Sequence, residues 1–215
     1  MEISLLFLPL IAAIISGFFG KYIGDRSSEI ITSLFVSTSA FLSLLLFYNV
    51  ITSGYENNIV IASWINSGTL NVNWSIKIDP LSSVMLVVVT VISALVHIYS
   101  IGYMSDDPHK PRFMAYLSLF TFSMLTLVSA DNFLQLFFGW ECVGLCSYFL
   151  IGFWFKKDTA NAAAIKAFLV NRVGDFGFAL GIFLIFYLFG TVNYDEVFLK
   201  VPELVNKEIS LLNNS

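Results

Sequence analysis

Charged side chains interrupt long apolar segments of this chain, and their chemistry is the first question that the sequence raises. Glu141 lies in FFGWECVGLCSYFLIGFW, residues 137–154, and Arg172 and Asp175 follow in a second apolar segment. An ionised side chain in hydrocarbon is costly unless it is paired, hydrated or protonated. Carboxylates and cations at such a depth are the material from which proton paths through membranes are built.

Glu141 has two interpretations. It lies nine residues into its predicted helix, which is about 14 Å at 1.5 Å per residue and therefore near the middle of a membrane. The carboxylate could form a static ion pair with a basic residue and fix the register of the helices. It could instead gain and lose a proton as its surroundings change, and we favour this second interpretation.

The other ionisable residues divide into a pair and two single groups. Arg172 and Asp175 are three residues apart and share one helix face, which predicts an ion pair. Lys166 lies nine residues before Asp175 and therefore about 180° away around an ideal helix, where it either snorkels to the surface or joins a proton path on that side. His97 is either a buried neutral side chain bonded to a neighbour or a proton-exchanging group.

No other catalytic arrangement competes with these residues. The sequence has no Ser-His-Asp arrangement, glycine-rich phosphate loop or metal-ligand cluster. Cys142 and Cys146 are four residues apart on one helix, a spacing that rarely allows a disulfide, and two thiols cannot complete a zinc site. We expect two free packing cysteines. We also expect no cofactor, no metal and no nucleic acid bound to this chain.

The elements that must position these residues are membrane helices. Of the 215 residues, 57% are hydrophobic and 12% are charged, about half the charged share of a soluble domain. The predicted spans are 3–20, 30–52, 81–104, 113–130, 132–155 and 160–189. The first span lacks a basic leader and a clear cleavage site, which indicates a retained helix rather than a signal peptide.

The segment between the second and third spans has a different period. In LNVNWSIKI, residues 70–78, apolar and polar side chains alternate, which predicts a half-buried strand. The preceding NIVIASWI and the NSG at residues 66–68 predict its hairpin partner and the turn. We therefore expect an all-α integral membrane protein of about six helices with a small β-hairpin outside the membrane. The polar, mildly amphipathic residues 193–215 are predicted to return to the hairpin's side.

The basic residues alternate between connections and predict the orientation. Three connections carry two basic residues each: Lys21 and Arg26, Lys110 and Arg112, and Lys156 and Lys157. The hairpin connection carries only Lys77. Because basic loops stay on the cytoplasmic side, the three connections are predicted to face the cytoplasm or matrix, and the hairpin to face outward.

Several motifs resemble one family. GWECVGLCSYFLIGFW and NAAAIKAFLVNRVGDFGFALG resemble subunit 5 of the proton-pumping NADH:quinone oxidoreductase, respiratory complex I. IDPLSSVML at 78–86 and HIYSIGYM at 97–104 are similar to the amino-terminal region of that subunit. The large subunit of multisubunit sodium/proton antiporters, which has no redox coupling, shares several of these motifs and is the alternative.

The resemblance implies an antiporter-like fold of two inverted five-helix repeats, of which this chain resembles the amino-terminal part. Residues 1–80 would then hold two spans and the outward hairpin, and 81–112 the third span and an inner loop. Residues 113–215 would hold the first three helices of the repeat and a polar tail.

The resemblance also assigns the proton-translocating residues. The family's fifth-helix glutamate falls on Glu141, its sixth-helix arginine and aspartate fall on Arg172 and Asp175, and its KAF lysine falls on Lys166. His97 is kept as a further candidate from the residues alone. In the family, the glutamate pairs with a lysine on a seventh helix, and no residue of this chain matches that lysine.

The family's biochemistry completes the expectation. The chain would translocate protons in the membrane arm while other subunits pass electrons from NADH to quinone. NADH, FMN, iron–sulfur clusters and quinone would be bound by those partner subunits. The partners would be other membrane-arm subunits, above all the neighbouring antiporter-like one, with membrane lipids and any remaining part of subunit 5. The location would be the mitochondrial inner membrane or, alternatively, a bacterial plasma membrane. A purely structural role, with a static Glu141, is the third reading.

Overall fold

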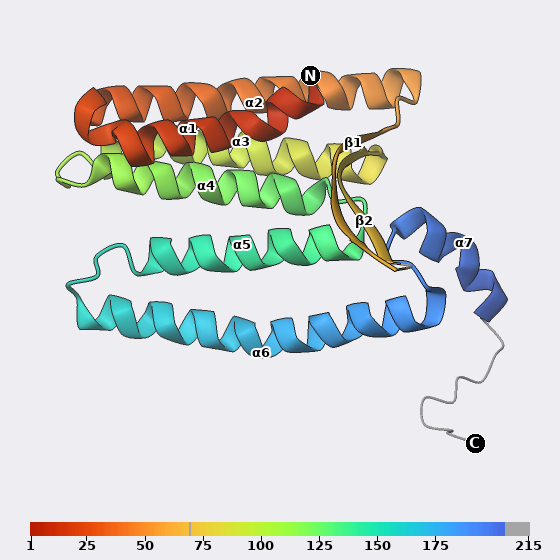
Figure 1. Ribbon diagram of the computed structural model, residues 1–215. Helices are drawn as coiled ribbons and strands as arrows, with labels where there is room; N and C mark the ends of the chain where they lie inside the picture. Colours follow the sequence, from red (N-terminus) through yellow and green to blue (C-terminus); the bar gives the residue numbers. More distant parts are fainter. Residues whose placement is uncertain (69, 205–215) are drawn as a thin grey trace.

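Six long helices run side by side and alternate in direction (Figure 1). This computed structural model describes residues 1–68 and 70–204. The elements are α1 (Glu2–Ile23), α2 (Asp25–Ser53), β1 (Asn57–Ser67), β2 (Leu70–Ile78), α3 (Pro80–Tyr103), α4 (Lys110–Val128), α5 (Phe133–Ile151), α6 (Asp158–Phe189) and α7 (Tyr194–Leu204). Within the described residues, α1 to α6 are each long and apolar enough to cross a membrane, which confirms the six predicted spans.

The observed helix ends differ from the predicted ones by a few residues. The largest difference is at α2, which begins at Asp25 rather than at residue 30. Gly24 alone joins α1 to α2, and its backbone has φ 88°, a conformation that glycine adopts without steric cost. Helix α5 ends at Ile151, four residues earlier than predicted, because the chain turns at Gly152.

The helices form a bundle with a pair attached to it. Helix α1 packs against α2 and α4, and α2 packs against α3, so that α1 to α4 make a four-helix bundle. Helix α5 packs on α4, and α6 packs on α5, which leaves the α5–α6 pair on one side of the bundle (Figure 1). We use these two names, the bundle and the pair, throughout.

The bundle and the pair meet at a very close contact. A Cβ atom built on Gly139 of α5 would lie 2.7 Å from the Leu127 Cα of α4. Real Cβ atoms do not approach other atoms so closely, so only glycine fits at this position. The backbones of α4 and α5 therefore touch two residues before Glu141.

The β-hairpin is present as predicted and is held against α5. Strands β1 and β2 pair antiparallel from Asn57↔Ile78 to Ser67↔Leu70. Three rings, those of Trp64, Trp74 and Phe138, contact one another edge to face at 5.0–5.6 Å. Such aromatic contacts add stabilisation beyond simple burial. The hairpin thus packs on helix α5 of the same chain.

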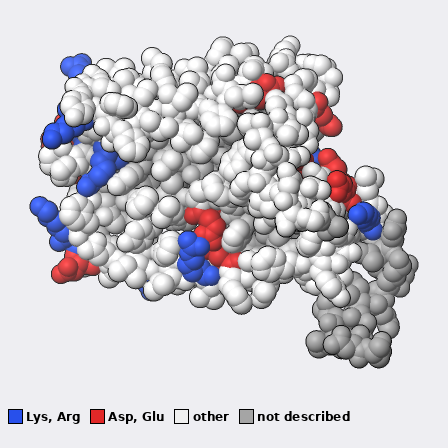
Figure 2. All heavy atoms as spheres, viewed as in Figure 1, with Lys and Arg blue, Asp and Glu red and all other residues white. Residues whose placement is uncertain are grey.

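The two ends of the helices differ in charge. Figure 2 shows that Lys and Arg side chains gather at one end, which we call the basic end. The connections α1–α2, α3–α4 and α5–α6 all lie there, while β1, β2 and α7 lie at the opposite, hairpin end (Figure 1). The predicted grouping of the three basic connections at one end is therefore confirmed.

Helix α7 was not predicted as a helix. Residues 193–215 were expected to be a polar tail on the hairpin's side, and α7 does lie at the hairpin end (Figure 1). The rest of the predicted tail, residues 205–215, lies outside the described residues.

Candidate functional site

A charged cluster joins α5 to α6 near the middle of both helices. The Arg172 guanidinium forms an ion pair with the Glu141 carboxylate through Nη1. The same nitrogen lies 3.9 Å from Asp175 Oδ2. The Glu141 and Asp175 side chains are 19% and 9% exposed. Two carboxylates therefore face one cation in a largely apolar setting, and Figure 2 shows acidic and basic atoms together between the two ends of the molecule.

The geometry of the two helices explains why Glu141 and Arg172 meet. Glu141 lies ten residues before the end of α5, and Arg172 lies fourteen residues after the start of α6. These positions are about 15 and 21 Å from the basic end. Helical side chains lean toward the N-terminus of their own helix. Because α5 and α6 are antiparallel, the two side chains lean toward each other and cover the difference.

Aromatic side chains surround the cluster. The Arg172 guanidinium lies over the Phe168 ring, 4.7 Å from its centroid, within the range of a cation–π interaction. The Trp140 indole Nε1 donates a hydrogen bond to Asp175 Oδ1 at 2.8 Å. Sequence reasoning missed both the Glu141–Arg172 contact and the Trp140 bond. The only available signal was the similar depth of the side chains on adjacent, antiparallel helices.

The predicted Arg172–Asp175 pair is present, but it is the longer of the two contacts of Arg172. Cys142 and Cys146 are both free, as expected. Among the described residues, no group of three His, Cys, Asp or Glu side chains is arranged to hold a metal ion. The chemistry that the cluster can perform is proton transfer to or from the Glu141 carboxylate. Its cation, Arg172, has a second carboxylate, Asp175, within reach.

Lys166 and His97 lie away from this cluster. Lys166 is exposed on α6, with no ion pair or hydrogen bond to the described part of the chain. His97 is fully buried between α3 and α4. Its Nδ1 lies 2.8 Å from the Ser93 carbonyl oxygen, and its Nε2 lies 3.0 Å from Ser118 Oγ. The structure thus brings together three of the five predicted residues and keeps the other two apart.

A second polar group, the anchor, ties the hairpin to the ends of α5 and α7. The Lys77 ammonium of β2 contacts Asp195 at 2.5 Å and Asp131 at 3.6 Å. Burial lowers the pKa of Lys77, but the two carboxylates outweigh that effect and raise it overall. The buried Gln135 side chain of α5 binds the Ser75 backbone twice, accepting from the N–H at 3.0 Å and donating to the carbonyl at 2.7 Å. The anchor therefore fixes β2 to the first turn of α5.

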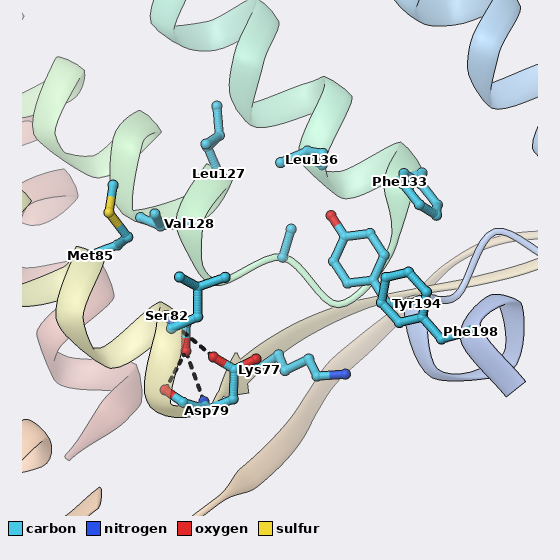
Figure 3. A pocket seen from close by; sticks show the side chains of 12 residues that line it. Lys77, Asp79, Ser82, Met85, Leu127, Val128, Phe133, Leu136, Tyr194 and Phe198 are labelled. Carbon is cyan, nitrogen blue, oxygen red and sulfur yellow. Dashed lines mark hydrogen bonds between the residues drawn. The ribbon is translucent and has the colours of Figure 1, made fainter. Parts of the chain in front are cut away.

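A pocket of about 430 Å³ lies beside the anchor. Figure 3 shows apolar side chains of α3, α4 and α5 around it, with Lys77 and Asp79 at one edge. Asp79 and Ser82 already bind each other in the N-terminal cap of α3. None of the five predicted site residues lines this pocket, whose lining is mostly apolar, with Lys77, Asp79, Ser82 and Tyr194 as its polar members.

Comparison with known families tests the resemblance predicted from the sequence. Residues 64–114 match the family described as NADH-Ubiquinone oxidoreductase (complex I), chain 5 N-terminus. Residues 130–214 match the family described as NADH:quinone oxidoreductase/Mrp antiporter, TM. Over these two segments the chain is similar to chain 5 of complex I. The resemblance predicted from the sequence is thereby confirmed.

Individual members of this family are similar over nearly the whole chain. NADH-ubiquinone oxidoreductase chain 5 of Chondrus crispus is 50% identical over 99% of this chain and 32% of its own length. NADH-quinone oxidoreductase subunit L of Rickettsia bellii is 51% identical over 98% of this chain and 33% of its own length. Chain 5 of Triticum aestivum is 55% identical over 92% of this chain and 30% of its own length. The chain spans about a third of the length of these relatives.

Solved structures share the fold. A membrane-bound sulfane sulfur reductase, an archaeal respiratory complex, has a chain that aligns with a TM-score of 0.80 and 18% identity over 95% of this chain and 41% of its own length. A chain of the Mrp complex from Dietzia aligns with a TM-score of 0.77 and 24% identity over 91% of this chain and 20% of its own length. These similarities support the antiporter-like helical fold.

Proposed function

We propose that this chain forms part of a proton-translocating membrane subunit of NADH:quinone oxidoreductase, with Glu141 as the group that binds and releases the proton. The observation that carries the proposal is the sharing of Arg172 between Glu141 and Asp175 in the middle of two membrane helices. The names and the identity of the chain 5 and subunit L relatives support the same function.

The cluster gives this function a physical mechanism. Protonation of Glu141 cancels its charge and thus its attraction for the Arg172 guanidinium. The nitrogen of Arg172 that contacts Glu141 is only 3.9 Å from Asp175 Oδ2, so a side-chain rotation carries the cation to the second carboxylate. Release of the proton restores the negative charge on Glu141 and draws Arg172 back. The position of one cation thereby follows the protonation of Glu141.

The remaining parts of the reaction belong to the assembly. NADH, FMN, iron–sulfur clusters and quinone would be bound by partner subunits, and this chain would be one part of the translocase. Its partners would be other membrane-arm subunits, including the neighbouring antiporter-like one, with lipids around them. Lys166 and His97 stay candidates for the proton path from the sequence. The membrane would be the mitochondrial inner membrane or a bacterial plasma membrane, since relatives come from both eukaryotes and Rickettsia.

The alternative is the large subunit of a sodium/proton antiporter without redox coupling. The likeness to the Mrp complex and the shared family of residues 130–214 favour its consideration. Purification of the tagged chain from its own membrane separates the two. Recovery with flavin- and iron–sulfur-containing subunits supports the oxidoreductase, whereas recovery with antiporter subunits and no redox centres supports the alternative.

Glu141→Gln tests the proposed role directly. Glutamine keeps the shape and hydrogen-bonding capacity of glutamate but cannot release a proton. We expect the complex to assemble, while proton uptake into vesicles, normalised to assembled complex, falls severely. Glu141→Asp should retain more uptake because the carboxylate survives. Glu56→Gln, the same change at an exposed site in the α2–β1 connection, is the control and should pump normally.

The static ion pair gives a different pattern. It predicts that Glu141→Gln first lowers stability and assembly, with pumping per assembled complex unchanged. Full pumping by Glu141→Gln removes Glu141 from the mechanism.

A further inference from the structure

Trp140 binds the carboxylate that Arg172 does not hold tightly. Trp140 immediately precedes Glu141 on α5, and its indole reaches across to α6, where Nε1 donates to Asp175 Oδ1 at 2.8 Å. The other oxygen of Asp175, Oδ2, faces Arg172 at 3.9 Å. The two oxygens of this buried carboxylate therefore have different partners, one neutral donor and one cation.

Ring packing against α6 holds one side of the Trp140 indole, and the side chain is half exposed. The Trp140 ring contacts the Phe178 ring of α6 edge to face at 6.0 Å, and Phe178 contacts Phe137 in the same way at 5.5 Å. Phe137 and Trp140 are three residues apart on α5, so the two α5 rings flank Phe178. These ring contacts favour the rotamer in which the N–H points at Asp175.

The chemistry of the donor matters as much as its position. An indole N–H donates one hydrogen bond, accepts none and carries no charge. It therefore holds the Asp175 carboxylate in place without neutralising it. A Lys or Arg at position 140 would compete with Arg172 for Asp175, whereas an aliphatic residue would leave the buried oxygen without a partner.

We propose that Trp140 is a positioning residue for proton transfer at Glu141. It holds the Asp175 carboxylate in place as the group that Arg172 binds when Glu141 is protonated. This inference rests on the proposed function, because it gives the exchange of Arg172 a fixed destination. Without the indole N–H, the Asp175 carboxylate turns toward Arg172 for its missing partner. Arg172 then stays with Asp175 whether or not Glu141 is protonated, and the exchange is lost.

The charges near Glu141 are few, which makes the effect of Trp140 measurable. From α6, Arg172 and Asp175 face Glu141. On α4, the other helix against α5, the only charged residues are Lys110 and Arg112 in its first turn. The remaining titratable side chains of α4 and α5 are Tyr116, Cys142, Cys146 and Tyr148.

Trp140→Phe is the test, because it keeps an aromatic ring beside Phe178 and removes the donor. The control is Trp154→Phe, since Trp154 donates in the same way to an exposed carboxylate, Asp107 Oδ2, at 2.9 Å at the basic end. In the assembled complex, we expect Trp140→Phe to lower protons pumped per NADH oxidised about tenfold. The pH profile of pumping should shift as well, because the cation held beside Glu141 changes. The control should change neither quantity.

A double variant separates positioning from packing. If Trp140 acts through Asp175, Trp140→Phe combined with Asp175→Asn pumps like Asp175→Asn alone. Losses that multiply in the double variant overturn the proposal, as does a Trp140→Phe complex that behaves like the control. If Trp140→Phe yields no complex, Trp140→His, which keeps a ring N–H, must restore both assembly and pumping, and its failure overturns the proposal.

The two proposals fail in distinguishable ways. Normal pumping by Glu141→Gln removes the proposed function, and the role of Trp140 with it. Severe loss in Glu141→Gln together with normal pumping in Trp140→Phe removes only the role of Trp140.

Discussion

The bundle and the pair bury their polar groups by different means. In α1 about 39% of the most apolar stretch is buried within the chain, against 11% in α6. The polar side chains of the bundle are mostly hydroxyls, and many bind carbonyl oxygens or one another, as Ser39 binds the Leu5 carbonyl and Ser43 binds Thr90. At the basic end of α2, Ser28 Oγ, Ser33 Oγ and the Oε1 atom of the buried Glu29, an exception to this pattern, lack such partners within the described residues. The pair instead carries Glu141, whose partner is a cation on the other helix.

This difference separates scaffold from chemistry. A hydroxyl that donates to a carbonyl of the preceding turn has its hydrogen bond within its own helix and carries no charge. It therefore supports packing and does not respond to a change of charge at another site. A charge shared between two helices depends on both of them, and any change in one charge alters the others. The bundle can therefore hold its shape while the electrostatics of the pair change.

The largest expected effect is in the pair. Arg172→Ala leaves the largely buried carboxylates of Glu141 and Asp175 without their cation. A fully buried pair would cost up to about 3–5 kcal/mol, and the half-exposed Arg172 side chain makes the cost smaller. Lys166→Ala on the same helix removes an exposed side chain and should cost far less. The thermal midpoint of the purified complex and the fraction of assembled complex measure both variants. Equal losses in the two variants would show that the cluster is not the polar centre of the pair.

An intermediate effect is expected in the bundle. His97→Leu leaves the buried Ser118 hydroxyl without its partner and removes the ring contact to the Ser93 carbonyl, and an unpaired buried polar group costs about 1–3 kcal/mol. We expect lower stability and less complex, with unchanged protons per NADH in what assembles. Tyr99→Leu, at an exposed position of α3, is the control for loss of an aromatic ring. A lowered proton ratio in His97→Leu would place His97 on the proton path and break the division between scaffold and chemistry.

The smallest effect is expected at the anchor. The raised pKa of Lys77 means that its two carboxylates stabilise the fold fully below the unfolded value of about 10.4. That stabilisation is lost as the pH rises through the folded value. Lys77→Met should therefore lower stability by at most about 1 kcal/mol, equally at pH 7 and 9.

The difference between the thermal melts of the wild type and the variant should begin to shrink above about pH 10.4 and vanish only above the raised folded pKa of Lys77. Lys156→Met, at an exposed site in the α5–α6 connection, is the control and should match the wild type throughout. A gap between Lys77→Met and the wild type that grows with pH would contradict the assignment of the anchor as an ion pair.

Hydropathy and alternation predict the spans and the hairpin because those elements depend on long or strictly periodic patterns. Helix α7 escapes prediction because it has only 11 residues and contains Pro202, which normally ends a helix. The anchor also escapes prediction, because Lys77, Asp131 and Asp195 come from three distant parts of the sequence. Contacts of that kind depend on tertiary packing, which a local pattern does not record.

The candidate site can be predicted from the sequence only where its contacts lie within one helix. Arg172 and Asp175 lie three apart on one helix, so their proximity follows from helix geometry alone. The contact of Glu141 with Arg172 depends on which helices are neighbours and on how far α6 extends at the basic end. The role of Trp140 was hidden because an aromatic residue in an apolar helix ordinarily signals packing.

The close contact at Gly139 sets the time scale of the exchange. Because the backbones of α4 and α5 already touch there, α5 cannot slide or tilt toward α4 as the charge on Glu141 changes. The Arg172 side chain, which is about half exposed, can rotate without any such movement of α5. Such rotations take picoseconds to nanoseconds, whereas enzymes typically turn over in about 1–1,000 milliseconds. Arg172 would re-equilibrate many thousands of times within each catalytic cycle, and the slow step would lie elsewhere.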